Sequence, residues 1–276
     1  APGRQGPGRR IGNPVFEEPV DAIAEGIVQQ NADDLCLDHH LQGYLVQTLN
    51  PYLEVPIHPD QVKAGFSGIR PLITTAEKEG TKSLLRDHEV EYDDQSGLIS
   101  LLGGKWTTYR LMASDTVERI LELDEREEPD RTANHPLVGA TGWHANYEDD
   151  LVRLYAISSD WAHHLSHHYG TDSPEIIHIY QEHPDHQEKW HPDFPYRVAE
   201  IIYHVRFEMA ITIRDVLAQR TRLEIQDWQA AYTVAPKIGH WLGKLFDWPE
   251  HERDAAILSY RTYLANAGEK AGIVVK

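Results

Sequence analysis

The hydrophobic pattern of this chain changes at about residue 145, and the change limits the folds open to it. Before that point, short alternating and glycine-interrupted runs predict strands. Beyond it, apolar residues recur at helical spacing in five segments, at 147–169, 173–181, 196–219, 225–246 and 249–267. We therefore expect an α+β fold, in which a partial antiparallel or mixed sheet with helices is followed by an all-α C-terminal domain.

The sequence divides into three predicted parts. Residues 1–16, with their Pro, Gly and Arg, predict a disordered or truncated start. Residues 17–135 predict a strand-bearing domain, and residues 136–276 the helical domain. Within the strand-bearing domain we expect a helix at 37–52, strands at 62–73, 84–92 and 98–102, and a helix at 107–123. In the helical domain, Asp227 and Ser173 stand where N-caps are expected.

Composition excludes several classes of function. The formal net charge is −18 over 276 residues, which disfavours binding to nucleic acid and to anionic lipid. The sequence has no apolar run near the roughly 18 residues that span a bilayer. The single cysteine, Cys36, excludes an intrachain disulfide and is typical of a reducing, cytoplasmic location.

A strand that runs into Gly103, Gly104 and Lys105 is the clearest candidate site. Glycines at a strand-to-helix turn allow a close approach to the backbone, and the first amides of a helix offer unpaired donors. With the Lys105 charge, the turn predicts a site for something anionic or electron-rich. A phosphate-binding loop is excluded, because Ile99 and Trp106 stand where that motif needs Gly and Ser or Thr. A plain turn with a surface lysine is the alternative.

Other polar residues allow two interpretations. Arg70 follows an apolar run, and alternation puts Arg86 and His88 on one strand face, so two guanidinium groups could converge on a phosphate. Salt bridges are the alternative for both arginines. Two histidine pairs at i, i+4 spacing favour an exposed polar helix face over a metal site, since no third ligand is evident; they are His163 with His167 and His164 with His168. Arginines around Met209 predict ion pairs that dock this helix onto the first domain.

Four segments together resemble the FAD-dependent glycerol-3-phosphate dehydrogenases. The likeness runs from about Glu17 to Leu264 with the segments in the same order and at similar spacing. The segments are Ala64–Leu72, Arg86–Glu89, Leu102–Ala113, and the helical run Ala199–Ala210 with Arg220–Arg222. The resemblance implies that residues 17–135 are part of an FAD and substrate domain.

The resemblance also implies a reaction and a set of roles. The family oxidises sn-glycerol 3-phosphate to dihydroxyacetone phosphate by hydride transfer to FAD, and passes the electrons to quinone. It implies substrate binding by Arg70, Arg86 and Thr108, and catalytic roles for His88, as proton acceptor, and Lys105. Cofactor contacts are implied for one continuous segment: Gly103, Gly104, Lys105, Trp106 and Thr107. No metal is expected.

One departure from the family limits these expectations. The Gly-x-Gly-x-x-Gly fingerprint that holds the FAD pyrophosphate is absent from the sequence. We therefore expect a C-terminal portion that is inactive alone, with FAD held mostly by a missing N-terminal domain. Two alternatives stay open: a non-catalytic remnant that acts as a helical interaction module, and an FAD-dependent oxidase of another substrate. The family further implies peripheral contact with a membrane, and a homo-oligomer is also open.

Overall fold

The computed structural model describes residues 39–66 and 88–276, which belong to two compact units. Residues 88–130 form the hairpin unit. Residues 39–66 and 131–276 form the helical unit. The α+β class and the helical C-terminal region predicted from the sequence are confirmed.

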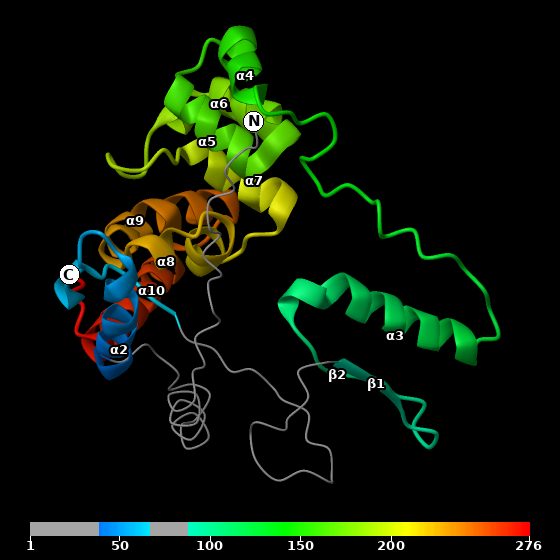
Figure 1. The fold of residues 1–276 in the computed structure, drawn as a ribbon. Coiled ribbons are helices and arrows are strands. Elements are labelled where there is room, and N and C mark those ends of the chain that lie inside the picture. Colours follow the sequence, from blue (N-terminus) through cyan, green and yellow to red (C-terminus); the bar gives the residue numbers. More distant parts are fainter. Residues whose placement is uncertain (1–38, 67–87) are drawn as a thin grey trace, which may run out of the picture. The chain divides into compact units, whose positions relative to one another are not determined.

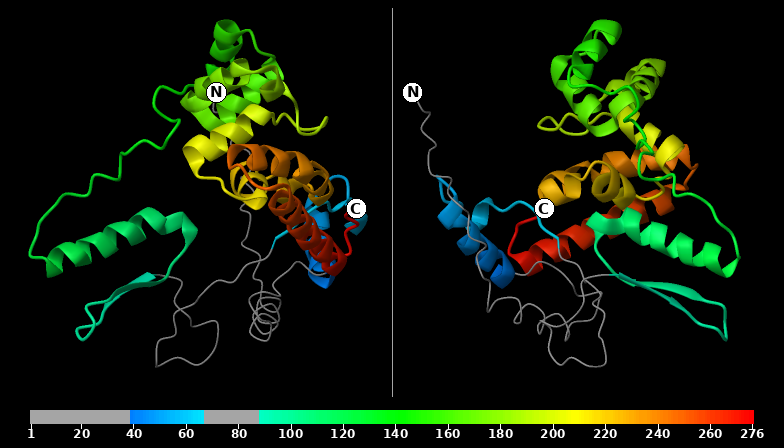
Figure 2. Two further views of the ribbon diagram at one scale, coloured as in Figure 1. Left: turned by 180° about the vertical axis from the view of Figure 1, so that it is seen from behind. Right: turned by 45° about the vertical axis from the view of Figure 1, so that its right-hand side comes forward.

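The hairpin unit consists of two antiparallel strands and one long helix. Strand β1 (His88–Tyr92) pairs with β2 (Ile99–Gly103), and the register places His88 opposite Gly103. At the turn, the Asp93 carboxylate accepts hydrogen bonds from the backbone amides of Gln95 and Ser96, which lower the pKa of Asp93. Helix α3 (Tyr109–Leu123) runs beside both strands (Figure 2).

The described residues of this unit contain the elements that the sequence predicts for them. The predicted strand at 98–102 and helix at 107–123 appear within a residue or two of their expected bounds. The predicted strand at 84–92 is present from His88, and residues 84–87 lie outside the described part. The prediction of a strand at 62–73 is wrong for residues 62–66, which form neither strand nor helix; the rest of that segment lies outside the described residues.

The helical unit packs its helices around one apolar core. Figure 1 shows α4, α5 and α6 gathered on one side, and α8, α9 and α10 with α2 on the other. Fully buried side chains from several helices form this core, among them Leu165, Ile177, Ile201, Leu242 and Leu264. The helices are α2 (His39–Leu49), α4 (Tyr147–Tyr155), α5 (Ser159–Tyr169), α6 (Ser173–Glu182), α7 (Val198–Glu208), α8 (Leu223–Gln226), α9 (Trp228–Leu245) and α10 (Glu250–Ala271).

Helix α7 is the central element of this unit. It packs against α6 on one side and against α9 on the other. Its side chains Val198, Ala199 and Ile201 are fully buried, and Ile202 is nearly so. Because α7 is surrounded, the polar residues that it carries must find their partners inside the protein.

Two of the helices predicted as single segments are interrupted. The segment at 147–169 is two helices, α4 and α5, with a left-handed residue at Ala156 (φ 53°). The segment at 196–219 breaks at Met209 (φ 56°), after which residues Asp215–Arg220 form a short π-helix. A left-handed conformation is costly for residues with a Cβ, and Ala and Met are not residue types that usually adopt it. The sequence therefore does not mark either break.

The two predicted N-caps have different outcomes. Asp227 caps α9, because its carboxylate accepts a hydrogen bond of 2.9 Å from the Ala230 amide. The prediction for Ser173 is wrong: Ser173 is the first residue of α6 and follows Asp172 at the N-cap position. The Ser173 hydroxyl donates instead to the Gly170 carbonyl at 2.5 Å.

Residues 39–66 pack with helices that lie far away in the sequence. The Trp228 amide donates to the Lys63 carbonyl at 3.1 Å, and the Lys63 ammonium pairs with Asp227 at 3.1 Å. This segment therefore belongs to the helical unit, although the sequence assigned it to the strand-bearing part. The described residues include no helix long and apolar enough to cross a bilayer.

Candidate active site at the glycine–lysine turn

The predicted turn joins β2 to α3 through two left-handed glycines. Gly103 has a φ of 67° and Gly104 a φ of 83°, a region that favours glycine. The chain then passes through a 3₁₀ turn at Trp106–Thr108 into α3. The Thr108 amide and the Thr108 hydroxyl both donate to the Lys105 carbonyl, at 3.0 and 3.1 Å. Thr108 therefore holds the turn together.

Gly104 also allows the helix to approach the hairpin closely. A Cβ added at Gly104 would lie 2.5 Å from both the sulfur and the terminal methyl of Met112, and 3.2 Å from the His88 Cβ. Met112 is on α3 and His88 on β1, so the glycine lies where helix and hairpin meet. The absence of a side chain is needed for packing as well as for the backbone conformation.

The turn presents a cation and the start of a helical segment to its surroundings. The Lys105 side chain is exposed, and no carboxylate of the described residues forms an ion pair with it. Trp106 is 86% exposed, and its ring stacks on Tyr109 with centroids 5.4 Å apart. Because Trp106 and Thr107 open the helical segment, their amides precede its first hydrogen-bonded turn. This combination suits an anionic or electron-rich aromatic partner.

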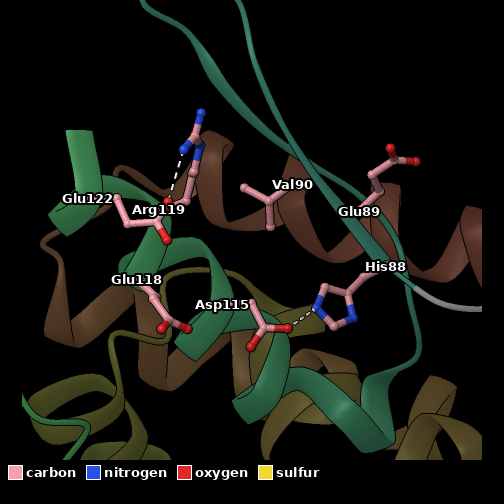
Figure 3. Close-up of a pocket in the computed structure, with 7 residues that line it drawn as sticks. All are labelled: His88, Glu89, Val90, Asp115, Glu118, Arg119 and Glu122. Atoms are coloured by element: carbon pink, nitrogen blue, oxygen red, sulfur yellow. Dashed lines mark hydrogen bonds and ion pairs between the residues drawn. The ribbon is translucent and has the colours of Figure 1, made fainter.

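His88 lies next to the turn but is bonded to α3. Its Nε2 is 2.7 Å from the Asp115 carboxylate, and its side chain is only 13% exposed (Figure 3). The shallow pocket beside it is lined by His88, Glu89, Val90, Asp115, Glu118, Arg119 and Glu122. Four carboxylates against one arginine repel a phosphate, so this pocket does not suit glycerol 3-phosphate.

The predicted phosphate ligands Arg70 and Arg86 lie outside the described residues. Their convergence with Lys105 therefore stays a prediction. The segment that the structure brings together is Gly103–Thr108, with His88 beside Gly104.

One of the histidine predictions for the helical unit is wrong. His164 is buried rather than exposed, and its Nε2 lies 2.7 Å from the Glu200 carboxylate. His163 and His167 are exposed, as expected. Arg206 pairs with Glu182 at 3.2 Å within the helical unit, and the docking of α7 onto the first domain stays a prediction.

A buried polar network on α7 was not predicted from the sequence. The Glu200 carboxylate also accepts hydrogen bonds from the Tyr169 hydroxyl at 2.8 Å and from the Arg197 amide at 2.8 Å. Burial alone would raise the pKa of Glu200, but the charge and hydrogen bond of His164 and the bond from Tyr169 lower it. The spacing of Glu200 and His204, one helical turn apart in an otherwise apolar helix, was the available signal.

Residues of the helical unit match a known protein domain. A protein-family model described as the C-terminal domain of alpha-glycerophosphate oxidase matches residues 130–253. The matched residues include helices α4 to α9 and the buried network on α7.

Curated relatives extend the likeness beyond this domain. A probable mitochondrial glycerol-3-phosphate dehydrogenase of Caenorhabditis elegans is 36% identical over 235 residues, which are 82% of this chain and 32% of the relative. The mitochondrial glycerol-3-phosphate dehydrogenase of Rattus norvegicus is 36% identical over 75% of this chain and 29% of its own length. The resemblance predicted from the sequence is confirmed, and the chain spans about a third of the length of these relatives.

A solved structure has a similar fold. The glycerol-3-phosphate dehydrogenase of Bacillus halodurans, determined in complex with FAD, matches 90% of this chain and 48% of its own chain. The TM-score is 0.71 and the identity 23%, so this likeness concerns the fold.

Proposed function

We propose that this chain is the C-terminal part of a flavoprotein that oxidises sn-glycerol 3-phosphate to dihydroxyacetone phosphate. The observation that supports this most directly is the open Gly103–Thr108 turn, in a chain whose residues 130–253 match the model of the alpha-glycerophosphate oxidase C-terminal domain. Relatives named glycerol-3-phosphate dehydrogenases, and a similar fold solved with FAD, support the substrate and the cofactor.

The turn has the properties that an isoalloxazine edge requires. Lys105 is exposed, and Trp106 and Thr107 are exposed at the start of the helical segment. In the proposed enzyme, these groups and the Gly103 and Gly104 backbone hold the electron-rich edge of FAD and stabilise negative charge there. When bound, FAD accepts the hydride from C2 of the substrate.

The remaining predicted residues act on the substrate. Arg70 and Arg86 bind its phosphate through planar guanidinium groups, and Thr108 contributes to the same pocket. His88 takes the proton of the C2 hydroxyl of a substrate bound at the glycine–lysine turn and not in the acidic pocket; for this its Nε2 must exchange its bond to Asp115 for one to the substrate. Asp115 therefore holds the His88 ring only before the substrate binds.

The electron acceptor and the location belong to the same proposal. Following the family resemblance, we propose quinone as the acceptor and peripheral contact with a membrane. The sequence predicts a cytoplasmic location, whereas the names of the curated relatives place those proteins in mitochondria. Fractionation of cells that express the full gene would separate these two locations.

Reconstitution tests the proposal. The chain is expressed in frame behind the N-terminal part of a curated relative, which gives a joined enzyme. We expect glycerol 3-phosphate to reduce a dye, while glycerol, which lacks the phosphate, does not. The Arg70→Ala variant should raise KM for glycerol 3-phosphate, with Arg110→Ala as a matched control, because Arg110 is bonded to Asp130.

Two outcomes would overturn the proposal. A joined enzyme that binds FAD yet ignores glycerol 3-phosphate would favour an oxidase of another substrate. A chain that folds but never supports flavin binding would favour the non-catalytic helical module.

A further inference from the structure

Three metal-ligating side chains meet on the surface of the helical unit. Glu148 lies in the first turn of α4, and His163 and His167 lie one turn apart on α5. One ligand atom from each of the three residues lies within 4.8 Å of the others. The sequence shows the two histidines but not the third ligand, because α4 and α5 bring Glu148 to them from 15 residues away.

Two ring nitrogens of this cluster lie close to one carboxylate oxygen. His163 Nδ1 is 2.6 Å from the Glu148 Oε2 atom, and His167 Nδ1 is 3.9 Å from the same oxygen. The two imidazole rings lie with centroids 4.1 Å apart. A metal ion could replace the proton between His163 and Glu148, since both atoms carry a lone pair once that proton leaves.

A second contact orients His167. Its Nδ1 lies 2.9 Å from the backbone carbonyl of His163, a contact in which the ring nitrogen donates. In the neutral ring this leaves the Nε2 lone pair available, so the His167 ring must rotate either to bring Nε2 to the metal or to release Nδ1 from the carbonyl. Metal-binding histidines commonly use one nitrogen for the metal and the other for a carbonyl or carboxylate. The Trp143 ring packs edge-on against His167, with the two ring centroids 6.4 Å apart, and bounds one side of it.

We propose that Glu148, His163 and His167 form a binding site for a divalent transition metal ion of the Zn²⁺ class. Two imidazoles and one carboxylate are a donor set that suits this class, with bonds of about 2.0–2.2 Å. The side chains are 35%, 63% and 50% exposed, so rotation can draw them together and water can complete the coordination. The ion would tie α4 to α5. The proposal is independent of the flavin chemistry.

Zinc titration of the full chain tests this site. Isothermal titration with ZnCl₂ should show one strong site per chain, above the weak background that 17 histidines provide. The His163→Ala/His167→Ala variant should lose roughly 100-fold or more in affinity, since metal sites weaken 10- to 100-fold even when outer partners are removed. The control is His251→Ala, an exposed histidine on α10.

A structural readout accompanies the titration. Hydrogen exchange of the α4 amides should slow when zinc binds to the parent chain, and should not change in the double variant. Glu148→Gln, which keeps the size of the side chain, should weaken zinc binding without loss of helical circular dichroism. The proposal is overturned if the double variant binds zinc as tightly as the His251→Ala control, or if zinc leaves α4 exchange unchanged.

Discussion

Acidification should destabilise the helical unit, and His204 provides a defined part of the effect. His204 lies on α7 with a fully buried side chain. The Tyr169 hydroxyl donates to Glu200, so its oxygen accepts from His204 Nε2 at 3.0 Å. Among the described residues, His204 Nδ1 is buried without a hydrogen-bond partner. Burial lowers the pKa of His204 to about 3, against an ordinary value of 6.5, with Arg220 adding to the effect and Glu200 opposing it.

The sign and size follow from proton linkage. The unfolded chain protonates His204 below pH 6.5, whereas the folded chain keeps it neutral down to about pH 3. The contribution of neutral His204 to the free energy of unfolding is therefore fully present above pH 6.5. It is lost as the pH falls toward 3, at about 1.4 kcal/mol per pH unit. Between pH 6.5 and 5 the loss is about 2 kcal/mol. Glu200, whose pKa is lowered from 4.5, adds to the loss of stability only below the window from pH 6.5 to 5.

Urea unfolding at pH 7, 6 and 5 measures this slope. Tryptophan fluorescence reports mainly on the helical unit, which contains six of the seven tryptophans. His168, whose pKa is also lowered by burial, adds to the slope, so the comparison must be between variants. Between pH 6.5 and 5, His204→Gln should lose about 2 kcal/mol less free energy of unfolding than the parent chain. The exposed control His251→Gln should lose as much as the parent.

Either of two results would refute this reasoning. One is an equal pH slope in the parent chain and in His204→Gln. The other, which needs no variant, is an NMR titration in which the His204 ring protonates between pH 7 and 5 in the folded chain.

Two further changes test the packing of the helical unit. Asp227→Ala should lower the free energy of unfolding by about 1 kcal/mol, because it removes the N-cap bond to Ala230; Asp227→Asn should restore most of it in the same urea experiment. Gly170→Ala should cost about 2–4 kcal/mol, because its φ is 55° and an added Cβ would lie 2.0 Å from the Gly139 carbonyl oxygen. Gly142→Ala, with a φ of 84° and open space around it, isolates the backbone strain, so equal losses in both glycine variants would contradict the contact argument.

Local patterns predicted the elements whose signals are local. The alternation in β1, the Gly103–Gly104 turn and the periodicity of α3 all appear close to their expected places. Each depends on residues within one element and its neighbouring turn. The same holds for the Asp227 cap.

Features that depend on tertiary packing were not predictable in this way. The left-handed breaks at Ala156 and Met209 occur at residues without turn propensity, so no local pattern predicts them. His164 is buried because α7 brings Glu200 to it, 36 residues away. Glu148 reaches His163 only through the packing of α4 on α5. A sequence pattern on one helix cannot show what the next helix supplies.

Anaerobic reduction of the joined enzyme tests the proposed role of Lys105 at the flavin. Glycerol 3-phosphate is mixed with the oxidised enzyme and the loss of flavin absorbance is followed by stopped flow. Removing one preorganised charge from a reacting centre typically slows the step about 100-fold or more. Lys105→Ala should therefore reduce its flavin about 100-fold more slowly than the parent, while Arg110→Ala should match the parent. Flavin reduction at the parental rate in Lys105→Ala would show that the Lys105 charge does not speed this step.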